Sequence, residues 1–138
     1  MSDAFRTALF VILSGGFQDA YTYCCRGEVF ANAQTGNIVL MSSAFFAGSW
    51  NIVLKYLIPV ISFLIGTAVA ELIHMKFKPC EKIHWRQIIL IIEIILLFAV
   101  GFIPRYINAP ANALVSFVCA MQVQTFHKIH GHAYASTM

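Results

Sequence analysis

Charged side chains are scarce in this sequence: Asp, Glu, Lys and Arg together make up 11% of its 138 residues. Soluble domains carry roughly 25% charged residues. Apolar residues make up 59% of the chain, and the mean hydropathy is +0.76. A soluble globule of this size cannot hide so much apolar surface, because its ratio of area to volume leaves a large wetted exterior. The composition therefore argues against an ordinary soluble domain and indicates an integral membrane protein.

Motifs of catalysis and metal binding are also missing. The four cysteines form no C-x-x-C motif, which argues against a redox centre or a structural disulfide. The sequence has no H-E-x-x-H motif, no Ser/His/Asp order and no paired catalytic carboxylates, so we expect neither an enzyme nor a cofactor. His127, His130 and His132 match no zinc spacing, and we expect no metal site. The basic residues form no patch of the kind that binds nucleic acid.

Long apolar stretches are what the sequence does contain. Four of them are long enough to cross most or all of a ~30 Å hydrocarbon core: Phe5 to Tyr23, Ile52 to Ile73, Ile88 to Ile103 and Ala109 to Phe126. The first lacks a signal-peptide cleavage site, so we expect it to be retained. A fifth stretch, residues 36–50, gives only about 22 Å of helix. We predict an all-α polytopic membrane protein of about five hydrophobic helical segments, forming one integral membrane domain over residues 1–138.

The basic residues predict the orientation in the membrane. Lys76, Lys78, Lys82 and Arg86 fall within the loop His74–Arg86, which the positive-inside rule makes cytoplasmic in a bacterial cell membrane. The short segment 36–50 has two interpretations: a re-entrant half-helix that begins inside the membrane, or a complete but irregular span. The first puts residue 6 on the cytoplasmic side with this loop and residue 26 outside, and the second exchanges the two. The charges do not choose between them.

The polar run that precedes the short segment is the candidate site. A helix starting near Gly36 leaves its first N–H groups unpaired, with Thr35 as the expected N-cap, and such a terminus can receive an anion or a carboxylate. Irregular backbone at membrane depth is tolerated where it is buried or lines a cavity. We therefore predict a site for a small polar or anionic solute. Its expected residues are Gln18, Asp19, Asn32, Gln34, Thr35, Gly36, Asn37 and Gln122.

Two intramembrane carboxylates, Asp19 and Glu93, are candidates for proton or ion coupling, because ionisable groups at membrane depth are costly to bury. The first functional hypothesis is a small-solute transporter or permease. The alternative is a non-transporting assembly or signalling component, in which the polar motif only holds helices together. Expected partners are the lipid bilayer, the solute and a second copy of the chain.

A shift of 104 residues suggests an internal repeat. It aligns Gln18 with Gln122, and residues 27–32 with residues 131–136 at the end of the chain. Both copies follow an apolar helix that ends in polar residues, and transporters are often built from such repeats. If segment 36–50 spans the membrane, the first and last helices point the same way. If it is re-entrant, the two are inverted.

Three motifs together resemble a known family. These are Gly-Phe-x-Asp-Ala at 16–20, Gly-x-Val-Phe-x-Ala-x-x-Thr-Gly-Asn at 27–37 and Tyr-Ala-x-Thr-Met at 134–138. In this order they are similar to the YoaK-like family of small bacterial integral membrane proteins, a domain of unknown function. Members of that family continue with a second Thr-Gly-Asn and further hydrophobic segments. The resemblance implies that this chain is an N-terminal fragment of a longer protein, and it implies a fold without a substrate.

Overall fold

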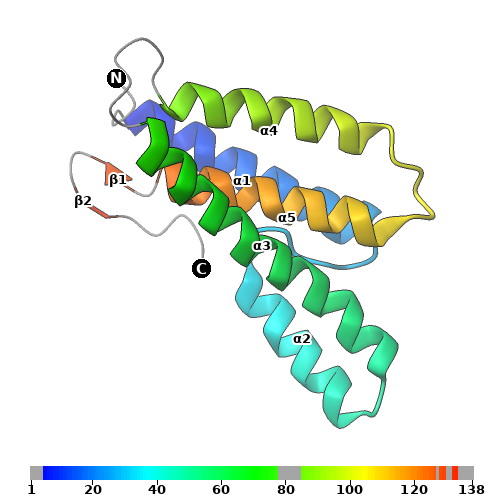
Figure 1. The fold of residues 1–138 in the computed structure, drawn as a ribbon. Helices are drawn as coiled ribbons and strands as arrows, with labels where there is room; N and C mark the ends of the chain where they lie inside the picture. The colour runs from blue at the N-terminus through cyan, green and yellow to red at the C-terminus, as the bar shows by residue number, and fades with distance from the viewer. Residues whose placement is uncertain (1–4, 78–84, 127, 130–131, 134–138) are drawn as a thin grey trace.

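Five helices account for most of the computed structural model, which describes residues 5–77, 85–126, 128–129 and 132–133 (Figure 1). The helices are α1 (Phe5–Cys25), α2 (Gln34–Phe46), α3 (Trp50–Phe77), α4 (Trp85–Gly101) and α5 (Asn108–Thr125). Two short antiparallel strands, β1 (Lys128–Ile129) and β2 (His132–Ala133), follow. The prediction of an all-α fold with five helical segments is confirmed. Most of the second copy of the aligned motif, residues 131 and 134–136, lies outside the described residues, as do residues 78–84 of the basic loop.

The short second helix differs from its predicted bounds. It covers residues 34–46 and not 36–50, because Gly48 adopts a φ of +71° and ends the apolar stretch in a turn before α3. At its start, the helix begins two residues earlier than expected, at Gln34. The backbone N–H of Gln34 donates to the Asn32 carbonyl at 2.9 Å. Thr35 is not the N-cap. Ala33 holds that position, and no side chain caps the helix there.

Helix α5 is the central element of the fold. Most of its side chains are buried, and α1, α3 and α4 pack around it while α2 packs on α3 (Figure 1). The hydrogen bonds from α1 to α5 join Ser14 to Gln122 and Gln18 to Cys119, so position numbers fall along α5 as they rise along α1. The two helices are therefore antiparallel.

Helices α3 and α5 run in the same direction. Gly66 of α3 lies against Phe117, and Glu71 accepts a hydrogen bond from Gln124 at 2.8 Å. The crossing is close: a Cβ added to Gly66 would lie 2.5 Å from the Phe117 carbonyl oxygen and 2.8 Å from the Ala120 Cβ. Gly66 is the residue that lets the two backbones meet, as small residues do at helix interfaces in membranes.

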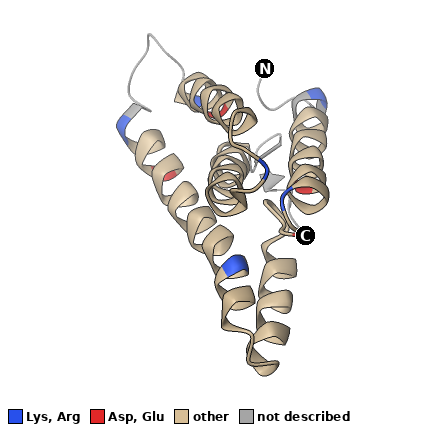
Figure 2. Cartoon of the chain, turned by 90° about the vertical axis from the view of Figure 1, so that its right-hand side faces the viewer, with Lys and Arg blue, Asp and Glu red and all other residues tan. Residues whose placement is uncertain are grey.

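The outer faces of α1 to α4 are strongly apolar. Phe46, Phe17 and Phe102 are 89%, 76% and 74% exposed. Charges are sparse on the ribbon (Figure 2). By length and mean hydropathy, α3 is the one helix among the described residues that can cross a membrane: 27 residues, Trp50–Lys76, with a mean hydropathy of 2.1.

Candidate functional site

After α1 the chain turns back alongside the helix it has just left. Gly27 and Glu28 adopt φ values of +89° and +60°, which reverse the direction of the chain. The Asn32 amide then donates to the Asp19 Oδ1 at 2.6 Å, and the Asn32 Nδ2 lies 2.9 Å from where a Cβ of Gly15 would stand. Gly15 is the middle residue of α1. We call residues 26–33 the returning segment, and it brings the start of α2 to the halfway point of α1.

Asn37 fastens the returning segment to α2. Its Oδ1 accepts from the Phe30 amide at 3.0 Å, and its Nδ2 donates to the Phe30 carbonyl at 2.6 Å and to the Gln34 Oε1 at 3.0 Å. Gln34 in turn donates to the Ala31 carbonyl at 2.7 Å. Asn37 is fully buried. Gln34 and Asn37 are two of the predicted solute ligands, and all of their described polar contacts are therefore with other parts of the chain.

Gly36 makes room for an aromatic ring and not for another backbone. A Cβ at this position would lie 2.8 Å from the Phe30 ring, which stacks on Tyr23 with centroids 5.0 Å apart. Thr35, the next predicted ligand, is exposed at the start of α2. The expectations that Thr35 caps α2 and that Gly36 admits another backbone are therefore wrong, while the role of both residues in a solute site stays a prediction.

Asp19 stands where an anion was expected. Its carboxylate accepts from the Asn32 amide, next to the beginning of α2, where the helix dipole favours negative charge. A second anion beside it would meet like-charge repulsion. The structure thus brings Asp19 and Asn32 together, and it weakens the expectation of an anionic solute at this terminus.

Gln18 and Gln122 meet where α1 and α5 cross. The Gln18 Nε2 donates to the Ser14 Oγ at 3.0 Å and reaches the Gln122 Oε1 at 3.5 Å, while the Gln122 Nε2 donates to the Ser14 Oγ at 3.2 Å. The Cys119 thiol donates to the Gln18 Oε1 at 2.8 Å. Sequence reasoning missed Ser14 and Cys119. Their spacing from the two glutamines was the available signal, because residues four or three apart share a helix face.

The 104-residue shift aligns the same two glutamines. Their contact and the antiparallel course of α1 and α5 correspond to the inverted form of the repeat. The repeat itself stays a prediction.

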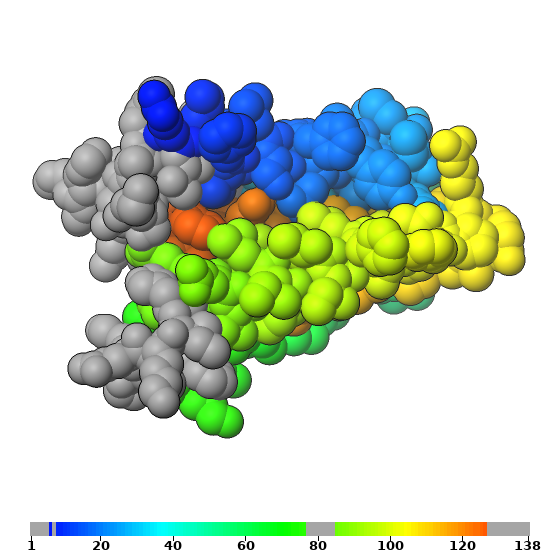
Figure 3. Space-filling model, turned by 90° about the horizontal axis from the view of Figure 1, so that it is seen from above, coloured from blue at the N-terminus to red at the C-terminus, as the bar shows by residue number. Residues whose placement is uncertain are grey.

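Glu93 is a buried carboxyl group of α4. It is 4% exposed on the face of α4 that packs on α5, and its Oε1 has no hydrogen-bond partner. One turn further along, Leu97 borders a groove of about 250 Å³ between α1 and α4, into which Ser14 and Gln18 also face. Figure 3 shows α5 at the floor between these two helices. The two predicted coupling carboxylates come from different helices: Asp19 of α1 accepts a hydrogen bond from the returning segment, and Glu93 belongs to α4.

Arg26 is a buried cation that sequence reasoning left out of the site. It is 3% exposed and donates to the carbonyls of Pro104 at 2.9 Å and Ile103 at 2.8 Å, and to the Tyr21 hydroxyl at 2.7 Å. These carbonyls follow the C-terminus of α4, where the helix dipole favours positive charge. Arg26 therefore joins the end of α1 to the end of α4.

Comparison with known proteins gives a family. Residues 7–138 match the model of a family described as "Protein of unknown function (DUF1275)". The chain belongs to the DUF1275 family. The match covers all three motifs of this DUF1275 chain and is consistent with the resemblance to YoaK-like proteins. No curated protein and no solved structure matches it.

Proposed function

We propose that this DUF1275 protein is a multi-pass protein of the bacterial cell membrane. In this arrangement α3, which is long and apolar enough by itself, crosses the bilayer together with the shorter helices α1, α4 and α5 packed in the same bundle, and α2 is a re-entrant half-helix. The apolar exteriors of α1 to α4 support this arrangement, because exposed patches of this extent are rare on soluble monomers. The returning segment supports the half-helix, since Asn32 reaches the middle of α1 before α2 begins.

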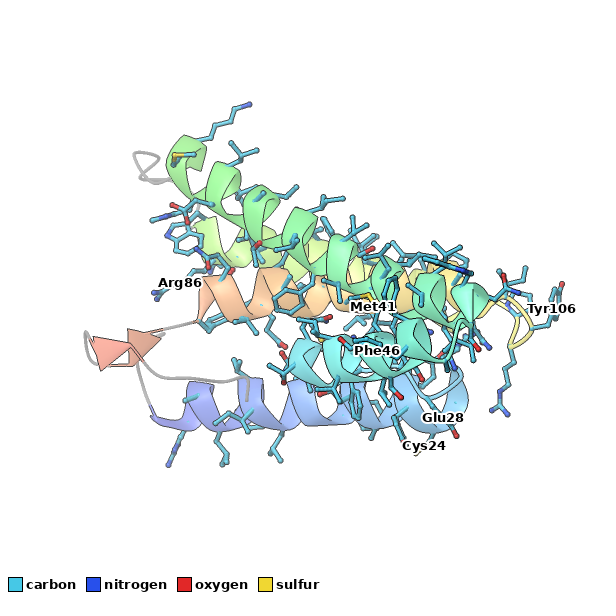
Figure 4. All side chains as sticks on the ribbon, turned by 90° about the horizontal axis from the view of Figure 1, so that it is seen from below. Cys24, Glu28, Met41, Phe46, Arg86 and Tyr106 are labelled. Carbon is cyan, nitrogen blue, oxygen red and sulfur yellow. The ribbon has the colours of Figure 1, made fainter. Side chains whose placement is uncertain are left out.

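The helix directions favour one orientation. They put the start of α1, the end of α3 and the start of α4 at the same end of the bundle. In Figure 4, Arg86 lies at this end, while Cys24, Glu28 and Tyr106 lie at the opposite end. Arg6, Lys76, Arg86 and Lys128 lie in or next to elements at the first end, and in the sequence Lys78 and Lys82 fall between Lys76 and Arg86. The positive-inside rule makes this end cytoplasmic, with Arg26 toward the outside.

We propose further that the protein transports a small polar solute. The observation that carries this proposal is the interrupted course of the chain at half depth, with Asn32 and Asp19 bonded beside the Gln18–Gln122 contact. Broken helices with polar groups at mid-membrane are the usual construction of solute sites in transporters. Glu93, buried with an unpartnered oxygen, is the coupling candidate on α4.

Solute uptake by the full-length protein in proteoliposomes tests the proposal. We expect Asp19→Asn to reduce the uptake rate at least tenfold, because it removes the carboxylate that holds the returning segment, and Glu93→Gln to abolish any dependence of uptake on a proton gradient. Glu28→Gln is the matched control, since this carboxylate is exposed at the outer turn. Wild-type rates in Asp19→Asn would overturn the site.

One observation favours the alternative of a non-transporting membrane component. Gln18, Gln34, Asn37 and Gln122 bond one another or the backbone, as polar groups that hold helices together do. On this alternative, variants at these positions lower thermal stability or partner co-purification, and solute flux is absent from the wild type as well.

A further inference from the structure

One stripe of α5 carries three side-chain oxygens that have no hydrogen-bond partner. They are the Asn108 Oδ1, the Asn112 Oδ1 and the Ser116 Oγ. The spacing of four residues places all three on one side of the helix. Asn112 is 3% exposed and Ser116 is fully buried. A buried polar atom without a hydrogen-bond partner destabilises the fold, and among the described residues these three atoms have none, so such a row calls for an explanation.

The outer two residues of the stripe, Asn108 and Asn112, lie against the returning segment. The Asn112 Nδ2 donates to the Arg26 carbonyl at 2.9 Å, and a Cβ on Gly27 would lie 3.5 Å from the Asn108 Nδ2. Closer to the middle of the bundle, Ala31 of the returning segment belongs to the same hydrophobic core cluster as Cys119. Cys119 lies almost one turn past Ser116 on α5. At the inner end of the segment the Asn32 Oδ1 is also buried and unpartnered. Among the described residues, unpartnered oxygens thus occur on α5 beside the outer turn, deeper along the same helix at Ser116, and at the inner end of the returning segment.

The chemistry of this lining selects its ligand. Amide oxygens accept hydrogen bonds and cannot donate them, so what fills the space must supply N–H or O–H groups. The Lys55 ammonium and the Arg26 guanidinium stand at the outer end, where they disfavour a small cation. The Asp19 carboxylate at the inner end disfavours an anion. An uncharged molecule with several hydrogen-bond donors is repelled neither by the two cations nor by the carboxylate.

We propose that the stripe Asn108–Asn112–Ser116 and the returning segment enclose a route that binds small uncharged solutes rich in hydrogen-bond donors, such as polyols, urea or simple amides. This inference rests on the proposed transport function for its purpose, because it names the class of solute. Its lining is a property of the fold, and it is testable without any measurement of transport.

Access of a small polar reagent to Ser116 tests the route. In a full-length background with the four native cysteines replaced, we expect iodoacetamide to alkylate Ser116→Cys at least tenfold faster than Val118→Cys. Val118 is the matched control, since it is fully buried two residues away on another face of α5. Asn108→Cys gives a second position should Ser116→Cys not elute as a folded, monodisperse protein. Equal, slow labelling of the stripe and the control would mean a dry interface and would overturn the inference.

Protection from labelling tests the solute class. We expect erythritol or urea to slow the alkylation of Ser116→Cys at least threefold, and we expect no protection by glutamate or by tetramethylammonium at the same concentration. Protection by a charged probe alone would overturn the assignment of uncharged solutes. No protection by any probe would mean that the route holds only water, and it would overturn the binding of solutes there. If labelling is fast and protected while proteoliposomes show no uptake, the transport function fails and the binding route stands.

Discussion

Replacement of Asn37 by alanine is the sharpest test of how the Thr-Gly-Asn motif works. The change removes three hydrogen bonds, two to the Phe30 backbone and one to Gln34. At about 0.5–1.5 kcal/mol for each bond, Asn37→Ala should lower the free energy of unfolding by about 1.5–4.5 kcal/mol. Asn37→Asp should also destabilise, because it puts a carboxylate oxygen where the Nδ2 now lies, 2.6 Å from the Phe30 carbonyl oxygen.

Thermal unfolding of the purified protein in detergent measures this effect. A loss of 1 kcal/mol corresponds to about 2–8 °C in Tm for domains of this size range, so the expected decrease is readily resolved. Asn51→Ala is the matched control, because Asn51 is exposed near the start of α3. If Asn37→Ala unfolds at the same temperature as Asn51→Ala and yet loses solute uptake, then Asn37 serves the solute and the structural reasoning fails.

Two further predictions concern packing and the ends of helices. Gly66→Ala should destabilise by about 1–3 kcal/mol, since the new Cβ meets the α5 backbone at 2.5 Å, whereas Gly16→Ala, with nothing within 4 Å, should raise stability by up to about 1 kcal/mol. Tm values of the pair check this, and a loss of equal size in both would refute the close crossing. Arg26→Gln should loosen the ends of α1 and α4 and speed hydrogen exchange of the amides near Ile103, while Arg105→Gln, at an exposed position, should change neither. Unchanged exchange in Arg26→Gln would show that the buried guanidinium does not hold these ends.

The apolar windows located the long helices because their signal is local. Each long stretch runs through one helix, and the observed bounds lie within a few residues of the windows. The short helix was harder to place. Its N-terminus depends on the bonds of Asn37 to Phe30, seven residues earlier, and no periodicity records a contact of that kind.

The candidate site was predicted in part. The sequence singled out Asp19 and Asn32, which the fold joins, because polar groups in an apolar chain stand out. It could not foresee that Asp19 would take the position expected for an anion, nor that Glu93 would be buried on the face of α4 that packs on α5. Those outcomes depend on which helix faces meet, and that is decided by the close approach at Gly66 and the clamp of Arg26.

The sequence by itself determined that this protein is helical, where its helical segments lie and where polarity interrupts them. It did so because composition and hydropathy act residue by residue. Only the tertiary structure decided that α2 begins beside the middle of α1, that α1 and α5 run in opposite directions, and that Asn108 and Asn112 of α5 lie against the returning segment. The physical reason is that these features arise from contacts between residues up to about a hundred positions apart. A local sequence pattern does not predict which residues make contact at that separation.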